Sequence, residues 1–148
     1  MNDYGRRIVV DLGFEAALGE ASRAIREEGL QIIARIDVRN QFWRDVGHDF
    51  RQYFLLEAWS PELALEAFRR NLDVGIVLPT TFAIYELADG KAAVVAKEPF
   101  SPFADDSQWR RDDPTLAALA DRESERVART LERLRQASSR RGAVSPAA

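Results

Sequence analysis

The chain has 148 residues and a formal net charge of −3, from 21 basic and 24 acidic side chains. This length predicts a single domain, and the interspersed, slightly acidic charge argues against a nucleic-acid partner. The chain contains no cysteine, which excludes disulfides, thiolate catalysis and cysteine-ligated metal clusters. The sequence shows no signal-peptide core and no long apolar run, so we expect a cytoplasmic protein with no membrane partner. We also expect no cofactor.

The N-terminal part of the chain alternates between strand and helix patterns. Residues 6–13, RRIVVDLG, have apolar side chains at every second position, which predicts a half-buried strand. From Phe14 the apolar residues recur at helical spacing for about fifteen residues, and Gly29 is a typical C-terminal stop. Residues 30–39, LQIIARIDVR, return to alternation and predict a second strand.

Two helices flank the next predicted strand. A short helix is predicted in NQFWRDVG, with Asn40 as its N-cap and Gly47 as its stop. Residues 51–59, RQYFLLEAW, are rich in aromatic and aliphatic side chains and predict a third strand. Ser60 is a favourable N-cap, and Pro61 a favourable first residue, for the helix that follows.

A hairpin is predicted next. Residues 75–87, GIVLPTTFAIYEL, have the composition of a strand, and the proline inside it, Pro79, implies an edge, a bulge or a break. Asp89 and Gly90 are typical of a hairpin turn, and residues 91–98 would form the return strand.

The C-terminal part contains one long predicted helix. Residues 99–114 have no hydrophobic period and predict an extended connection, after which Asp113 and Pro114 cap and start the helix. We assign residues 1–136 to a single domain and residues 137–148 to a C-terminal tail. The hairpin, together with the break in strict alternation, predicts an α+β fold with helices over one face of a mainly antiparallel sheet.

Few side chains indicate catalysis or metal binding. A polar turn explains His48, the only histidine, better than a metal site does, because one imidazole is a weak basis for metal binding. Glu57 and Glu62 flank the strand-to-helix junction, where capping and solubility also explain them. The motifs of serine hydrolases, P-loop NTPases and HExxH zinc enzymes are absent. We therefore predict no catalytic residues and no metal site.

Three stretches of the chain carry a recognisable pattern. They are a helix with a glycine stop and a strand, FEAALGEASRAIREEGLQIIARIDV; a strand-to-helix junction, FRQYFLLEAWSPELALEAF; and a proline-interrupted strand, DVGIVLPTTFAIYELADGKAAV. Together they resemble a bacterial family, the domain of unknown function 302 family, whose corresponding segments run yriLgaCnP at the junction and iGlllPCnv at the interrupted strand. The resemblance covers roughly residues 5 to 98.

This chain departs from the family at the positions where the family has its reactive side chains. Trp59 and Ser60 stand where the family has cysteine and asparagine, and Thr80 and Thr81 stand where the same pair follows Pro79. Two nearby cysteines would indicate redox, metal or thiol chemistry, which this chain cannot perform. The resemblance implies a TBP-like strand–helix–four-strand–helix arrangement with a curved antiparallel sheet, and association as a homodimer. Such a fold does not by itself imply DNA binding.

Three hypotheses for the function follow. The first is a non-enzymatic dimeric module that binds a small ligand or protein partner in a pocket between sheet and helices, bordered by Trp59, Ser60, Pro79, Thr80 and Thr81. The second is an enzyme, or a degenerate relative of a thiol redox or metal-binding protein, that uses the histidine, the two glutamates or the two threonines named above. The third is a purely structural or interaction domain in which Trp59 belongs to the core.

Overall fold

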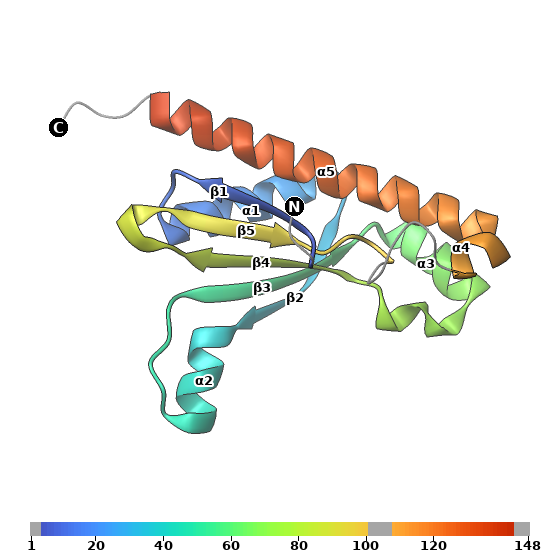
Figure 1. Cartoon of the computed structure of the whole chain (residues 1–148), viewed down its shortest axis with the longest axis horizontal. Coiled ribbons are helices and arrows are strands. Elements are labelled where there is room, and N and C mark those ends of the chain that lie inside the picture. The colour runs from blue at the N-terminus through green and yellow to red at the C-terminus, as the bar shows by residue number, and fades with distance from the viewer. Residues whose placement is uncertain (1–3, 101–107, 144–148) are drawn as a thin grey trace.

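A computed structural model describes residues 4–100 and 108–143 of the chain (Figure 1). In chain order the elements are β1 (Arg6–Val10), α1 (Phe14–Glu27), β2 (Gln31–Asp37), α2 (Val38–Val46), β3 (Tyr53–Trp59), α3 (Pro61–Arg70), η1 (Leu72–Ile76), β4 (Thr80–Glu86), η2 (Ala88–Gly90), β5 (Ala92–Ala96), α4 (Gln108–Asp112) and α5 (Pro114–Ala143). The elements η1 and η2 are 3₁₀ helices. The protein is an α+β protein, as the sequence predicts, and shorter helices are inserted between its strands.

The strands form one antiparallel sheet in the order β1-β5-β4-β3-β2. β4 and β5 form the predicted hairpin, and Asp89 and Gly90 in its turn have φ values of 63° and 71°. β1 and β2 lie at opposite edges of the sheet, so α1, which connects them, has to cross it. Figure 1 shows α1 and α5 on the same side of the sheet, which confirms the predicted placement of helices over one face.

The main core lies between the sheet and the helices α1 and α5. Leu56, Phe82 and Ile84 point into it from β3 and β4 and are fully buried. Ile25 on α1 and Val127 on α5 pack against them. Because successive strand residues point to opposite faces, the alternate residues of these strands face away from α1 and α5.

The ends of α1 and α5 follow the predicted signals. Gly29 comes after α1 with φ of 81°, in the left-handed region that favours glycine. At the start of α5, Asp113 Oδ1 accepts a hydrogen bond from the Leu116 N–H at 3.0 Å. The side chain of Asp113 therefore caps this helix as predicted.

The C-terminal helix extends beyond the predicted domain boundary at residue 136. α5 continues to Ala143 because its last turns contact the domain. Ser138 Oγ accepts a hydrogen bond from the Asp11 N–H at 2.9 Å, and Arg141 forms an ion pair with Glu20 at 2.7 Å. The first part of the predicted tail is thus helical and docked, and residues 144–148 lie outside the described residues.

Two segments differ from the predicted local structure. The residues before Pro79 do not form a strand, since Leu72–Ile76 is a 3₁₀ helix and β4 begins directly after the proline. Pro79 therefore marks a break rather than an edge, because β4 is the central strand of the sheet. The connection predicted over residues 99–114 contains a short helix, α4, and its residues 101–107 lie outside the described part.

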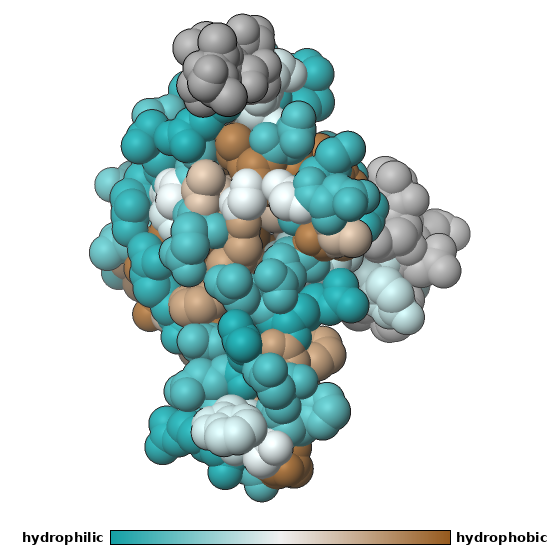
Figure 2. Space-filling view, turned by 90° about the vertical axis from the view of Figure 1, so that its left-hand side faces the viewer, coloured by the Kyte–Doolittle hydropathy of each residue, from teal (hydrophilic) through white to brown (hydrophobic). Residues whose placement is uncertain are grey.

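α2 projects away from the sheet (Figure 1). Its N-cap is Asp37 rather than the predicted Asn40, because Asp37 Oδ1 accepts the Asn40 N–H at 3.0 Å. Its predicted stop, Gly47, is confirmed at φ 64°. None of its nine residues is buried, and Trp43 and Val46 are 60% and 71% exposed. Figure 2 shows this lower end of the molecule as a narrow protrusion with pale and brown side chains among teal ones.

Candidate ligand pocket

The strand-to-helix junction lies at Ser60, between β3 and α3. Its backbone is extended, with φ of −80° and ψ of 114°, and its C=O accepts the Ala64 N–H at 2.8 Å. Pro61 is the first helical residue, as predicted. The Ser60 side chain, however, makes no capping hydrogen bond. The first-turn N–H groups of α3 thus lack the side-chain acceptor that a serine N-cap normally supplies.

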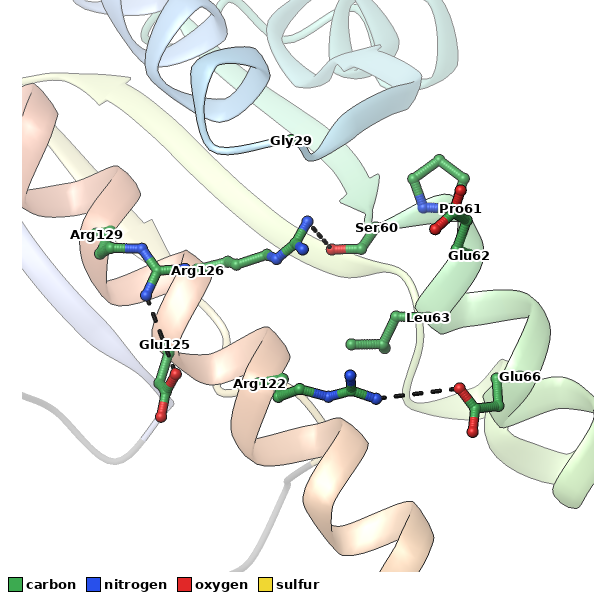
Figure 3. Close-up of a pocket in the computed structure, with 10 residues that line it drawn as sticks. All are labelled: Gly29, Ser60, Pro61, Glu62, Leu63, Glu66, Arg122, Glu125, Arg126 and Arg129. Carbon is green, nitrogen blue, oxygen red and sulfur yellow. Dashed lines mark hydrogen bonds and ion pairs between the residues drawn. The ribbon is translucent and has the colours of Figure 1, made fainter.

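A buried carboxylate on α5 takes up the Ser60 hydroxyl instead. Glu123 is 0% exposed. Its Oε1 accepts the Ser60 hydroxyl at 2.7 Å, and its Oε2 accepts the Ser60 N–H at 3.3 Å. Ser60 Oγ in turn accepts a hydrogen bond from Arg126 Nη1 at 3.2 Å (Figure 3). Because a buried carboxylate is costly unless it is hydrogen-bonded, this network fixes the junction against α5.

Gly29 leaves room for the Arg126 guanidinium. A Cβ placed on Gly29 would lie 2.9 Å from Arg126 Nη1, which is closer than ordinary van der Waals contact. The positive φ of Gly29 is a separate reason for glycine at this position. The turn after α1 therefore packs directly on Arg126 and helps to hold it beside Ser60.

A pocket of about 520 Å³ opens beside this network. Figure 3 shows α5 along one side of it and α3 along the other, with the turn at Gly29 closing one end. The residues that line the pocket are Gly29, Ser60, Pro61, Glu62, Leu63, Glu66, Arg122, Glu125, Arg126 and Arg129. Three of them are arginines and three are glutamates, so the formal charges of the lining cancel.

The three pocket arginines are neutralised to different degrees. Arg129 Nε donates to Glu28 Oε2 at 2.9 Å, and Arg122 lies 4.0 Å from a carboxylate oxygen of Glu66. Arg126 hydrogen-bonds only to the neutral hydroxyl of Ser60, and no carboxylate of the described chain lies within 4.0 Å of it. Arg126 is therefore the arginine whose charge has no direct partner in the pocket.

Glu28 ties the middle of α5 to the end of α1. Burial disfavours the charged form of Glu28, but hydrogen bonds from Arg133 and Arg129 outweigh this effect and lower the pKa of its carboxyl group. Glu28, which accepts these bonds, directly precedes Gly29 in the sequence. They therefore help to fix the wall of the pocket that carries Arg126.

The predicted binding residue Trp59 packs in a second apolar cluster. Its ring meets that of Phe68 edge to face, with centroids 5.8 Å apart. The cluster also contains Leu63 of α3, Leu78 and Leu119 of α5, all of them buried. Trp59 is half-buried there and supports α3 from β3.

The residues around Pro79 occupy two different environments. Thr80 is 0% exposed, and its Oγ1 finds no hydrogen-bond partner in the described part of the chain. Thr81 Oγ1 donates to the Glu57 carboxylate, 2.8 Å from Oε1. The Pro79 C=O accepts a hydrogen bond from Lys97 Nζ at 3.2 Å. Burial lowers the pKa of Lys97, and the nearby Glu57 carboxylate opposes that change.

The strand register explains why the predicted residues do not converge. Ala58 pairs with Thr80, and Glu57 pairs with Thr81. Cross-strand partners point to the same face and neighbouring residues point to opposite faces. Trp59 therefore faces away from the side on which Thr80 is buried. Of the five predicted residues, the structure brings Ser60 to the pocket.

The side chains considered for catalysis are also dispersed. Glu62 lines the pocket, whereas Glu57 lies on the sheet with Thr81. His48 is exposed in the connection between α2 and β3. In residues 4–100 and 108–143, no three His, Asp or Glu side chains come together in a way that could hold a metal ion. Over the same residues, none of the helices has the length and apolar character needed to cross a membrane.

Sequence reasoning missed Glu123, Arg126 and the role of Gly29 beyond that of a helix stop. A signal for Glu123 existed, because it follows Leu119 and precedes Val127 by four residues each, on the apolar face of α5. A glutamate on a buried stripe predicts a buried polar contact. Arg126 gave no such signal, since evenly spaced arginines are typical of a solvated helix face.

The observed fold defines the class of the protein: an α+β domain in which α1 and α5 cover one face of a five-stranded antiparallel sheet. The same fold occurs in the crystal structure of an uncharacterized conserved protein DUF302 from Bacillus stearothermophilus, with a TM-score of 0.71 and 22% sequence identity. The match covers 88% of this chain and 97% of that chain. At this identity it shows a shared fold alone.

Residues 7–137 match the family model of the domain of unknown function DUF302, and the chain belongs to this family. The match confirms the predicted resemblance and extends it beyond residue 98 through most of α5. The sequence contains none of the family's cysteines. No curated protein is similar to the chain.

Proposed function

We propose that this DUF302 protein is a non-enzymatic dimeric module that binds a small molecule in the pocket between α3 and α5. The observation that supports binding is Arg126, whose guanidinium is held by Ser60 and Gly29 at the pocket without a carboxylate partner in the described chain. A guanidinium presents five N–H donors. Only one of these is hydrogen-bonded among the described residues, so the others are available to a ligand.

The burial of the Ser60–Glu123 pair supports a role without catalysis. A serine beside a carboxylate resembles a nucleophile beside a base. Ser60, however, is only 3% exposed, and its hydroxyl donates to Glu123 rather than into the pocket. A nucleophile must reach the reacting atom of its substrate. The pair therefore serves the architecture of the junction.

Native mass spectrometry of the purified protein tests this proposal. We expect the wild type to retain a small molecule, and Arg126→Met, which keeps the length but removes the charge, to lose it. Arg135→Met is the matched control, because Arg135 is exposed on the same helix and pairs with Glu132 outside the pocket. Equal retention by wild type and Arg126→Met would contradict the proposed site, and so would a wild type that never carries a small molecule.

We further propose that the protein forms its dimer through β2 and α2. β2 is an edge strand, and Ile33 and Ile36 on it are exposed, as are Trp43 and Val46 on α2. An edge strand presents unpaired N–H and C=O groups. A two-fold axis would let β2 pair antiparallel with its own copy and cover the apolar side chains of α2.

Sedimentation at micromolar concentration tests the dimer. We expect a dimer mass for the wild type and a monomer mass for Trp43→Glu. Leu72→Glu is the control, because Leu72 is an exposed apolar residue far from β2 in the sequence. A monomeric wild type would exclude this part of the proposal.

We also propose that the protein is bacterial and cytoplasmic and that its fold is TBP-like. The family resemblance supports the bacterial source and the fold group. The cysteine-free composition suits a reducing compartment such as the cytoplasm.

A further inference from the structure

The charges around the pocket are separated in space. Arg126 lies at the end closed by Gly29, and no carboxylate of the described chain pairs with it directly. Glu62 lies on α3, on the other side of the pocket, and has no ion pair or hydrogen bond among the described residues. Figure 3 shows the side chain of Leu63 directed from α3 toward α5. A cation and an anion that form no ion pair among the described residues thus line the same cavity, one on α5 and the other on α3.

The surroundings of each group determine which ligand charge the pocket can accept. Behind Ser60 lies the Glu123 carboxylate, and Glu66 and Glu125 also line the cavity. A simple anion at Arg126 would be attracted by the guanidinium but repelled by these carboxylates, because Coulomb interactions are strong in a partly desolvated site. A simple cation at Glu62 would in turn face the pocket arginines. Neither kind of ion fits a lining whose formal charges cancel.

We infer that the ligand is a small zwitterion of the α-amino-acid class, held by its carboxylate at Arg126 and by its ammonium group at Glu62. Arginine is suited to the first contact, because its planar guanidinium can donate two parallel hydrogen bonds to one carboxylate. Leu63, which also lines the pocket, adds apolar surface to the lining. The volume of about 520 Å³ lies within the range of small-molecule sites. This inference rests on the proposed function and names the ligand class of the same pocket.

Titration calorimetry with matched compounds tests the inference. The panel contains α-amino acids, the carboxylic acids that lack only the amino group, and the amines that lack only the carboxylate. We expect binding of at least one amino acid and at least tenfold weaker binding of both its matched analogues, because each analogue leaves one pocket charge without a partner.

Two variants assign the contacts. Arg126→Met should weaken amino-acid binding by about tenfold or more, and Glu62→Gln should weaken it by a smaller factor because Glu62 is exposed. Glu62→Gln should also reduce the preference for the amino acid over the matched carboxylic acid, which a purely structural effect would not do. Arg135→Met should bind as the wild type does. Unchanged melting temperatures show that the variants remain folded.

The outcomes separate the inference from the proposed function. Equal binding of the amino acid and its matched carboxylic acid would overturn the zwitterion and leave a small-molecule pocket in place. Absence of binding across the panel, with a different molecule retained in native mass spectrometry and lost in Arg126→Met, would have the same meaning. Absence of both binding and retention would overturn both statements.

Discussion

The chain departs from its family at two motifs, and each motif carries a buried hydroxyl group that the structure uses in a different way. Ser60 directly follows β3 and is hydrogen-bonded to Glu123 and Arg126 on α5. Thr80 begins β4 and is equally buried, but its hydroxyl has no partner among the described residues. The first hydroxyl joins the sheet to a helix, and the second is enclosed by the apolar core.

The difference between these junctions lies in their neighbours rather than in the two residues. A buried hydroxyl contributes to stability only when a partner replaces the water that it loses. α5 provides that partner for Ser60, because Glu123 lies on its buried face. Across from Thr80 lies Ala58, which has no polar side chain. Similar sequence motifs can therefore place a hydroxyl group in a hydrogen-bonded network at one junction and among apolar side chains at the other.

Glu123→Ala should produce the largest effect on the Ser60 junction. It removes two hydrogen bonds to a charged acceptor and leaves the Ser60 N–H buried without a partner. We expect the free energy of unfolding to fall by about 3 kcal/mol, measured by urea denaturation. Glu125→Ala, on the exposed face of the same helix, should change it by less than about 0.5 kcal/mol. Equal effects of the two variants would show that the buried network is not what stabilises the junction.

Gly29→Ala tests whether the close approach to Arg126 matters beyond the backbone conformation of Gly29. Its control is Gly47→Ala, because Gly47 also has a positive φ but a Cβ there would meet nothing within 4 Å. Each substitution should cost about 1 to 2 kcal/mol of stability for the left-handed backbone. Only Gly29→Ala should also move the guanidinium and weaken ligand retention. Equal retention by the two variants would contradict a specific contact with Arg126.

Thr80→Val should act in the opposite direction. The substitution keeps the shape of the side chain and removes a hydroxyl that finds no partner in the described chain. We expect the free energy of unfolding to rise by about 1 kcal/mol. Thr81→Val is the matched comparison and should lower stability, because Thr81 Oγ1 donates to Glu57. Loss of stability in Thr80→Val would show that this hydroxyl has a partner after all.

Glu28→Gln should have the smallest effect, and one that depends on pH. The pKa of Glu28 is lowered in the folded protein, so its charge stabilises the fold above the pKa of the unfolded chain. This contribution is lost as the pH falls through the lower, folded pKa. The variant should be less stable than the wild type at neutral pH, by at most about 1 kcal/mol, and the difference should disappear in acid. A difference that stayed constant with pH would point to packing instead of charge.

The fold follows well from the sequence because local signals determine its elements. Gly29, Asp113 and the Asp89-Gly90 turn each have a local physical role that the structure confirms. The site follows less well, because it depends on contacts between residues far apart in the chain. Ser60 and Glu123 are 63 residues apart, and no local pattern predicts that they meet. The opposite directions of Trp59 and Thr80 depend on strand register, which becomes fixed only when the sheet forms.

The pocket wall is also the longest element of the protein. α5 has 30 residues, or about 45 Å of helix. It contacts Ser60 through Glu123 and Arg126, and further along it contacts Glu28 at the end of α1 through Arg129 and Arg133. The wall cannot open locally without separating α5 from α1, so amide hydrogens on both sides of Arg126 should exchange with solvent in one cooperative step. A ligand in the pocket should slow exchange along the whole helix and not only in the turn it touches.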